Sequence, residues 1–230
     1  MIKLGFFPRS FLFVPARPRL AIKRYVFAVA VLALANLACY LGENFHTVVN
    51  DKVYRSAQLG SDSLESHITR EGVRSVINLR GSNPGREWYQ QECAVAMRNG
   101  VRHFDVPIDS DFAPSGQELI DLVRVLKSCP KPVLMHCQSG IDRSGVAAAI
   151  SVLLLDPEGS LDKALDQLSL RFGHMPWKAN WARQYAFVHE YGAWLAQREL
   201  LHSPAHFQQW LALAGAVPAQ SLRAESEPRR

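Results

Sequence analysis

The sequence predicts an α/β domain with a central, mainly parallel β-sheet flanked by helices. Short apolar runs of strand length alternate along the chain with longer segments of helical periodicity. Successive parallel strands need a crossover connection, usually a helix, so this alternation favours a parallel sheet. The chain has 230 residues, 48% of them hydrophobic, which is enough for one domain with a sizeable core and terminal extensions.

The individual elements are apolar patterns bounded by residues that end strands and helices. Asn50-Asp51 is a turn pair between two short strands, Asn83-Pro84-Gly85 lies in a loop, and Asn99-Gly100 ends a helix. The expected strands are 48–49, 53–54, 73–79, 101–108 and 132–135. The expected helices are 61–72, 87–98, 116–128, 145–155, 161–170 and 177–200.

The N-terminal region combines a basic stretch with an apolar one. Residues 1–24 carry basic side chains and no acidic one, and residues 25–41 are apolar apart from Asn36. This pattern predicts a signal-anchor transmembrane helix over 25–41, at the short end of the range for a bilayer span. The basic flank would stay in the cytoplasm and the folded domain, residues 44–200, would face the periplasm. The alternative is a cleaved signal peptide, because residues 33–35 offer a small-residue cleavage site.

The ends and the charge carry less information. Residues 201–230 are expected to form a C-terminal tail, partly disordered, with a short amphipathic piece at 207–213. The formal net charge of +5 is modest, and several positive charges lie in the terminal regions. It permits attraction to acidic headgroups or phosphorylated substrates without requiring it. Four cysteines are too few for a disulfide framework.

The most informative stretch runs from His136 to Gly145, between an expected strand and an expected helix. A loop that leads from a strand into a helix directs backbone N–H groups at one spot, which binds an anion with help from the helix dipole. Cys137 begins this loop, where such surroundings favour the thiolate and make it a nucleophile. Arg143 follows six positions later, and its planar guanidinium group can bind two phosphate oxygens. Ser144 can cap the following helix.

This order of residues indicates chemistry on a phosphate group. Cys137 would attack phosphorus while Arg143 and the N–H groups of the loop hold the phosphate oxygens. The Ser144 hydroxyl would stabilise the leaving thiolate when water attacks the phosphocysteine. A zinc site is disfavoured, because His136 and Cys137 lack a second ligand pair at finger-like spacing. The residues expected to bind substrate are Gln138, Ser139, Gly140, Ile141, Asp142 and Ser144.

Residues 136–145 resemble the phosphate-binding loop of the cysteine-dependent protein tyrosine and dual-specificity phosphatases. Residues 53–58 and 76–81 resemble the bacterial branch of the dual-specificity group, and the similarity covers about residues 50–195. The resemblance implies the cysteine-dependent phosphatase fold and a phosphocysteine intermediate, with no metal, no other cofactor and no nucleic-acid partner. With the predicted anchor it implies a bacterial inner-membrane enzyme. The oligomeric state stays open.

The resemblance also implies a general acid, an aspartate about thirty residues before the cysteine. Asp105, Asp109 and Asp111 lie in that neighbourhood, and Asp111 is preferred, then Asp109, then Asp105. In the family the histidine before the cysteine orders the loop, which is the role expected of His136. Asp142 is expected to point to solvent, since an acid beside an anion site is otherwise unfavourable.

Several alternatives remain open at this stage. The substrate is expected to be a phosphorylated protein, as for a protein tyrosine or dual-specificity phosphatase, with an envelope lipid or glycolipid phosphate as the alternative. Arg55, Arg80 and Arg86 are expected either to line the mouth of the site or to be surface charges. A non-catalytic phosphate-binding module and a sulfur carrier of the rhodanese type are the other classes. In an oxidising compartment Cys93 or Cys129 could trap the nucleophile if either lies close.

Overall fold

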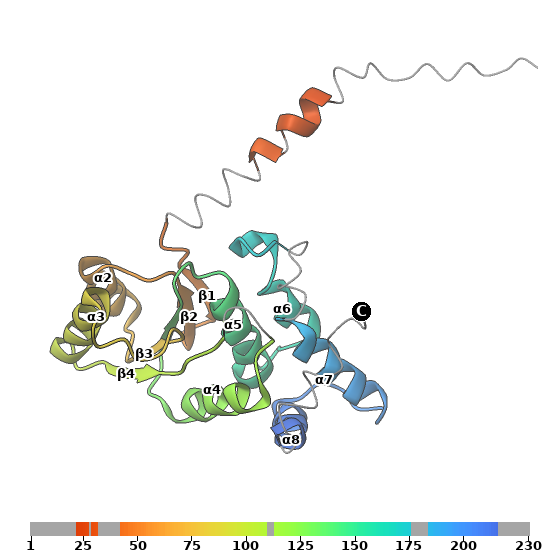
Figure 1. Cartoon of the computed structure of the whole chain (residues 1–230). Coiled ribbons are helices and arrows are strands. Elements are labelled where there is room, and N and C mark those ends of the chain that lie inside the picture. Colours follow the sequence, from red (N-terminus) through yellow and green to blue (C-terminus); the bar gives the residue numbers. More distant parts are fainter. Residues whose placement is uncertain (1–21, 28, 32–41, 110–112, 176–183, 216–230) are drawn as a thin grey trace, which may run out of the picture. The chain divides into compact units, whose positions relative to one another are not determined.

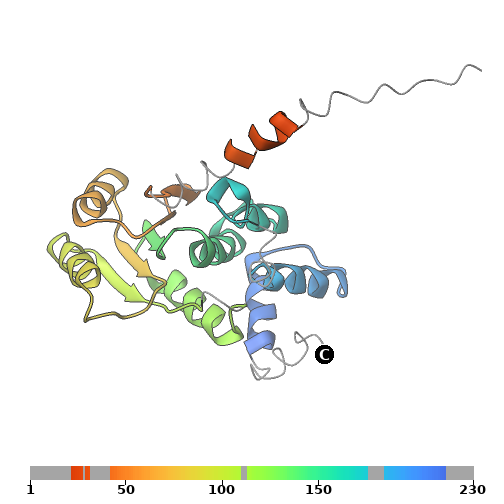
Figure 2. The ribbon, with the colours of Figure 1, turned by 45° about the horizontal axis from the view of Figure 1, so that its top comes forward.

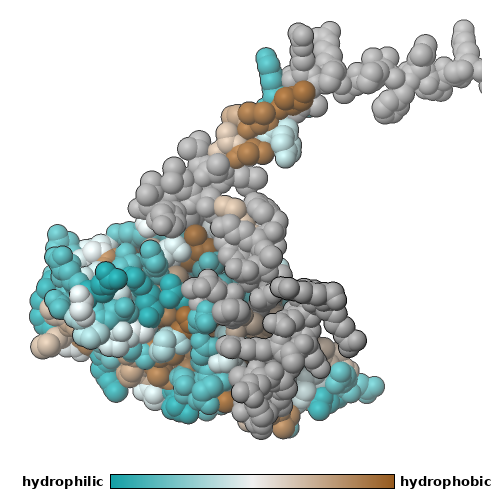
Figure 3. Space-filling model, in the orientation of Figure 1, coloured by the Kyte–Doolittle hydropathy of each residue, from teal (hydrophilic) through white to brown (hydrophobic). Residues whose placement is uncertain are grey.

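The computed structural model describes residues 22–27, 29–31, 42–109, 113–175 and 184–215. The chain divides into two compact units, residues 1–37 and residues 38–230. The first unit holds helix at 22–27 and 29–31, and the large apolar side chains of this segment, among them Tyr25 and Phe27, are exposed. Figure 3 shows brown, hydrophobic surface along this helix.

The prediction of a transmembrane helix over residues 25–41 is wrong. Within the described ranges, no helix is both long enough and apolar enough to span a lipid bilayer. Residues 28 and 32–41 of the predicted span lie outside the described residues. The predicted single-pass inner-membrane location with its periplasmic domain, and the membrane as a partner, rested on a helix of that length, which the described residues do not contain.

The second unit is built on a five-stranded sheet in the order β1-β2-β5-β3-β4 (Figure 1). Its strands are β1 His46–Val49, β2 Val53–Ser56, β3 Ser75–Asn78, β4 Arg102–Asp105 and β5 Val133–His136. The sheet is mixed and mainly parallel: β1 runs antiparallel to β2, while β2, β5, β3 and β4 are parallel. The tight turn between Val49 and Val53, closed by Lys52 N–H to the Val49 carbonyl at 3.0 Å, permits only antiparallel pairing.

Helices cover both faces of this sheet, as the turned view in Figure 2 shows. One face packs against α2 and α3, and the other against α4, α5 and the helices that follow them. The helices are α2 Ser61–Glu71, α3 Glu87–Arg98, α4 Gly116–Ser128, α5 Asp142–Leu155, α6 Leu161–Asp166, the 3-10 helix η1 Leu170–Phe172, α7 Ala186–Ala196 and α8 Pro204–Gly215.

The central strand shows how the sequence produces these two layers. Side chains alternate along a strand, so Leu134 packs with α2 and α3 while Val133 and Met135 pack with α4 and α5. All three are fully buried, which is why the run has no polar face. Strand β5 therefore runs through the middle of the core, and the loop that follows it starts from a fixed position.

Some boundaries differ from those predicted. Helices α3 and α4 coincide with the expected 87–98 and 116–128, whereas the expected helix 161–170 is divided into α6 and η1. The expected helix 177–200 appears as α7 from Ala186, with 176–183 outside the described residues. The predicted tail begins with α8, which packs against α4 and α5, and residues 216–230 are not described.

Candidate active site

Cys137 is the first residue after β5, at the carboxyl end of a parallel strand. Its side chain is only 2% exposed. The loop of Gln138, Ser139, Gly140 and Ile141 then leads directly into α5, which begins at Asp142. The N–H groups of the first turn of a helix have no partner within the helix, so this order places an anion-binding helix start next to the cysteine.

Four successive carbonyl groups of this loop are held by residues outside it. The Gln58 N–H donates to the Gln138 carbonyl at 3.1 Å. Asn44 Nδ2 donates to the carbonyls of Ser139 and Gly140, at 3.2 and 3.1 Å. Arg55 donates from one terminal nitrogen to the carbonyls of Gly140 and Ile141, both at 2.9 Å.

This arrangement decides where the N–H groups of the loop point. In a trans peptide the C=O and the following N–H point in opposite directions. The carbonyls of residues 138–141 face Gln58, Asn44 and Arg55, so the N–H groups of residues 139–142 point away from these three residues. Successive N–H groups turned to one side of a loop form a concave anion-binding surface.

Gly140 lets the loop lie this close to strand β2. Its φ angle is +70°, a left-handed conformation that side chains disfavour. A Cβ atom at this position would lie 2.6 Å from the Ala57 nitrogen and 2.7 Å from the Ser56 carbonyl carbon. Both of those atoms are backbone and cannot move aside, so only glycine fits between the loop and the end of β2.

Arg55 lies behind the loop and does not line its mouth. Its side chain is fully buried, it also donates to the Gln167 carbonyl at 2.7 Å, and its guanidinium lies 4.4 Å from the centre of the Phe172 ring. Asn44 Nδ2 also donates to the Phe172 carbonyl, at 3.2 Å. Arg55 and Asn44 therefore tie the loop to the segment that runs from α6 to η1.

We expect the Arg55→Lys variant to weaken the loop while keeping the positive charge. A lysine ammonium cannot donate in the fork geometry that serves Gly140, Ile141 and Gln167 together. Leaving such buried carbonyls without a donor should lower the free energy of unfolding by about 2–4 kcal/mol and weaken phosphate binding at least about tenfold. Urea unfolding and inhibition by inorganic phosphate measure the two effects. Arg74→Lys, at an exposed position beside β3, should change neither; an unchanged phosphate affinity in Arg55→Lys would contradict this role.

Arg143 lies in the first turn of α5 and is half-buried. A second guanidinium group is near it. Burial lowers the pKa of Arg80, the charge of Arg143 lowers it further, and Cys137 and Glu92 act in the opposite direction. Arg80 donates to Gln58 Oε1 at 3.2 Å and lies 3.9 Å from the centre of the Trp88 ring. Arg80 thus lies within electrostatic range of both Cys137 and Arg143.

Ser144 does not cap α5 as predicted, because the helix begins earlier, at Asp142. The capping position is occupied by Ile141 and has no side-chain hydrogen bond. Ser144 lies within the first turn, fully buried, and its hydroxyl donates to the Ser56 carbonyl at 3.3 Å. Its hydroxyl must therefore rotate away from Ser56 before it can serve a leaving thiolate.

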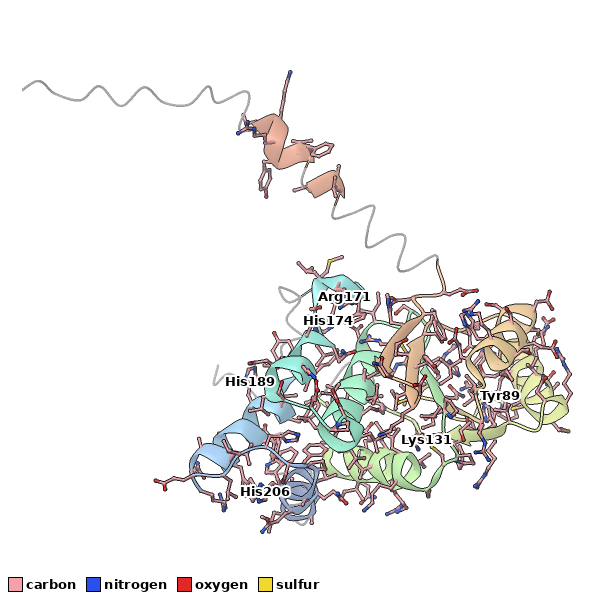
Figure 4. All side chains as sticks on the ribbon, turned by 180° about the vertical axis from the view of Figure 1, so that it is seen from behind. Tyr89, Lys131, Arg171, His174, His189 and His206 are labelled. Carbon is pink, nitrogen blue, oxygen red and sulfur yellow. The ribbon has the colours of Figure 1, made fainter. Side chains whose placement is uncertain are left out.

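Asp142 does not simply point to solvent, contrary to the expectation. Its Oδ1 lies 3.1 Å from Nδ1 of His174, a side chain that is fully buried and is labelled in Figure 4. The carboxylate is therefore drawn toward the segment that follows η1. An acid is tolerated at the start of α5 because it has a histidine partner outside the loop and the helix dipole favours a negative charge there.

The three candidate general acids are placed differently. The Asp105 carboxylate accepts hydrogen bonds from Asn78 Nδ2 at 2.8 Å and from the Tyr89 hydroxyl at 2.5 Å. That second bond raises the pKa of Tyr89, labelled in Figure 4, to about 12. The Asp109 N–H donates to Glu118 Oε1 at 2.7 Å. Asp111, the preferred candidate, lies outside the described residues.

Cys93, Cys129 and Cys137 are free thiols in the structure. Burial raises the pKa of the Cys93 thiol. Across the part of the chain that the structure describes, no group of three or more His, Cys, Asp or Glu side chains is arranged to hold a metal ion.

Sequence patterns did not identify three residues that support the loop: Asn44, Gln58 and Glu92. Only Glu92 left a signal that could have been seen. It shares one face of α3 with the buried residues Val95 and Ala96, three and four positions later. A carboxylate on the apolar face of a helix needs a buried partner, so its position should have drawn attention.

Comparison with known proteins places this site in a family. The family model described as "DSP-PTPase phosphatase fused to NAD+ Kinase" matches residues 36–175, about three fifths of the chain. No curated protein matches the sequence. Among solved structures, the core catalytic domain of the PP-IP phosphatase SIW14 from S. cerevisiae is 20% identical with a TM-score of 0.50, over 68% of this chain and 93% of that one. TpbA from P. aeruginosa is 24% identical with a TM-score of 0.48, over 64% and 84%. The SIW14 likeness supports the fold alone.

Proposed function

Because the chain belongs to the DSP-PTPase family described as fused to NAD+ kinase, we propose that it hydrolyses phosphate monoesters of proteins through a phosphocysteine at Cys137. The earlier resemblance to dual-specificity phosphatases is confirmed by this membership, which supports a phosphatase as the class of enzyme. The protein substrate and the roles of single residues are our proposal. One observation carries them: a cysteine at the end of β5 opens a loop whose carbonyls are all held from behind.

In the first step the Cys137 thiolate attacks phosphorus and the bond from phosphorus to the leaving oxygen breaks. The N–H groups of residues 139–142 and the Arg143 guanidinium hold the three other phosphate oxygens, where charge gathers in the transition state. The leaving oxygen takes a proton from a carboxylic acid, for which Asp111 is our first choice and Asp109 our second. Asp105 is the least favoured, since Asn78 and Tyr89 already donate to its carboxylate.

In the second step water attacks the phosphocysteine and the bond between sulfur and phosphorus breaks. Inorganic phosphate leaves, and the Cys137 thiolate is restored. A proton from the attacking water returns to the carboxylate that acted as acid in the first step. The Ser144 hydroxyl, turned away from the Ser56 carbonyl, would donate to the departing thiolate.

Two residues near the mouth support a permissive substrate site. Arg80 is half-buried and stacked on Trp88, which is itself partly exposed. This pair offers a cation and an aromatic face beside the loop, without demanding one particular alcohol as the leaving group. No segment of the sequence clearly matches the long tyrosine-recognition loop of the tyrosine-specific phosphatases. This also favours a shallow pocket that accepts phosphotyrosine and phosphoserine or phosphothreonine.

The test is a substrate panel with the full chain, in reductant and a metal chelator. We expect hydrolysis of phosphotyrosine and phosphothreonine peptides with kcat/KM within about a hundredfold of each other, on the scale of ~10⁴ M⁻¹s⁻¹ or below. Hydrolysis confined to a phosphorylated lipid headgroup would replace the protein substrate with the lipid alternative. Binding of all of these without hydrolysis would indicate the non-catalytic module. Loss of activity on adding the chelator would contradict the cysteine mechanism.

A further inference from the structure

A buried acidic residue lies directly behind the start of the proposed catalytic loop. Glu92 lies on α3 and is 4% exposed. Its Oε1 accepts from His103 Nε2, on β4, at 2.8 Å. Its Oε2 lies 3.0 Å from His136 Nε2, on β5, and His136 immediately precedes Cys137. One carboxylate thus joins three elements beneath the loop.

The carboxylate has a third partner and is ionised. Gln58 Nε2, from the segment after β2, donates to Glu92 Oε2 at 2.5 Å. Burial alone would raise the pKa of Glu92, but the hydrogen bonds from His103 and His136, with the charge of His136 and the bond from Gln58, bring it down to about 2. A buried carboxylate is maintained only when such donors offset the cost of removing it from water.

The two nitrogens of the His136 ring face different partners. Its Nδ1 lies 3.3 Å from the Cys137 carbonyl oxygen, and its Nε2 lies 3.0 Å from Glu92 Oε2. The ring is therefore held between the Glu92 carboxylate and the peptide group of Cys137.

We propose that Glu92 is a positioning residue for the phosphatase site: it holds the His136 ring in place and so fixes the peptide that carries Cys137. The ring reaches Cys137 through the bond from Nδ1 to the carbonyl of that residue. The carbonyl of His136 is held at the same time by the Leu79 N–H at 2.9 Å. The peptide groups on both sides of this junction thus have fixed orientations, and the thiolate is placed against the N–H groups of the loop.

Gln58 extends the reach of Glu92 to the rest of the loop. Its side chain donates to Glu92 and accepts from Arg80, and its backbone N–H holds the Gln138 carbonyl. Glu92 therefore orients the residues on both sides of Cys137, one through His136 and one through Gln58. Glutamine at position 92 would keep the size of the side chain but could accept from only one of the two histidines and would present an N–H₂ group to the other.

The inference rests on the proposed function, and the Glu92→Gln variant tests it. We expect kcat for a phosphotyrosine peptide to fall roughly tenfold, with KM and inhibition by inorganic phosphate changed by less than about twofold. The matched control is Glu87→Gln, the same change at an exposed position of the same helix; its kcat should stay within about twofold of the unsubstituted chain. A Glu92→Gln variant as active as this control would overturn the inference.

Two further measurements separate a positioning role of Glu92 from an effect on the stability of the protein. In ¹H–¹⁵N spectra, the backbone amide signals of Cys137 and Gln138 should shift in Glu92→Gln and stay in place in Glu87→Gln, and unshifted signals in Glu92→Gln would refute the proposal. In a double-mutant cycle, Glu92→Gln should cost clearly less once His136→Asn is present, because part of its effect passes through that ring; fully additive losses would overturn it. If the unsubstituted chain hydrolyses no phosphate ester, the proposed function fails, whereas the ¹⁵N result stands independently.

Discussion

The Cys137→Ser variant is expected to lose hydrolysis by on the order of 10⁴-fold or more while still binding phosphate esters. A serine hydroxyl fits where the thiol lies, so the loop, its carbonyl contacts and Arg143 should keep their places. The hydroxyl stays protonated at neutral pH and attacks phosphorus far more slowly than a thiolate. Initial rates on a phosphotyrosine peptide, and binding of the same peptide by calorimetry, measure the two properties separately.

Cys129→Ser is the matched control for this substitution. Cys129 is also a buried free thiol, but it lies at the end of α4, where Lys131 Nζ approaches its sulfur at 3.1 Å. Its kcat should stay within about twofold of the unsubstituted chain. Retained hydrolysis in Cys137→Ser, or an equal loss in both variants, would rule out a phosphocysteine at Cys137.

The Arg143→Lys variant is expected to lower kcat/KM by about 10²–10³-fold without unfolding the protein. Lysine keeps the positive charge at the first turn of α5 but loses the planar fork that binds two oxygens of one phosphate. Because this interaction should be strongest when charge gathers on those oxygens, kcat should fall more than phosphate affinity. Steady-state kinetics and inhibition by inorganic phosphate separate the two effects.

Arg124→Lys provides the comparison for a mere change of cation. Arg124 is an exposed residue of α4, the helix that precedes β5, and it pairs with Asp121 at 2.7 Å. Exposed pairs of this kind contribute about 0–1 kcal/mol, so neither stability nor rate should change measurably. A loss of less than about fivefold in Arg143→Lys would mean that the N–H groups of the loop, rather than the guanidinium, provide most of the stabilisation.

Patterns that are local in the chain predicted much of this protein. The expected helices 87–98 and 116–128 coincide with α3 and α4, because each combines helical apolar spacing with clear ends. The predicted membrane span at 25–41 was wrong. It rested on apolar composition, and composition alone does not specify a helix of membrane length. The start of α5 was placed three residues late, since the anion loop itself turns into the helix at Asp142.

The loop from Cys137 to Arg143 is one contiguous segment, so its order of residues alone specified a nucleophile and an arginine six positions apart. What supports that loop comes from elsewhere in the chain. Asn44 lies 95 residues before Ser139, and Arg55 lies 85 residues before Gly140. Glu92, on helix α3, reaches His136 at the end of β5. No local pattern links such residues, because they become neighbours only when parallel pairing brings the ends of β2, β3 and β5 together. The sequence alone therefore predicts the chemistry, and only the packing of the sheet decided which side chains hold the loop in place.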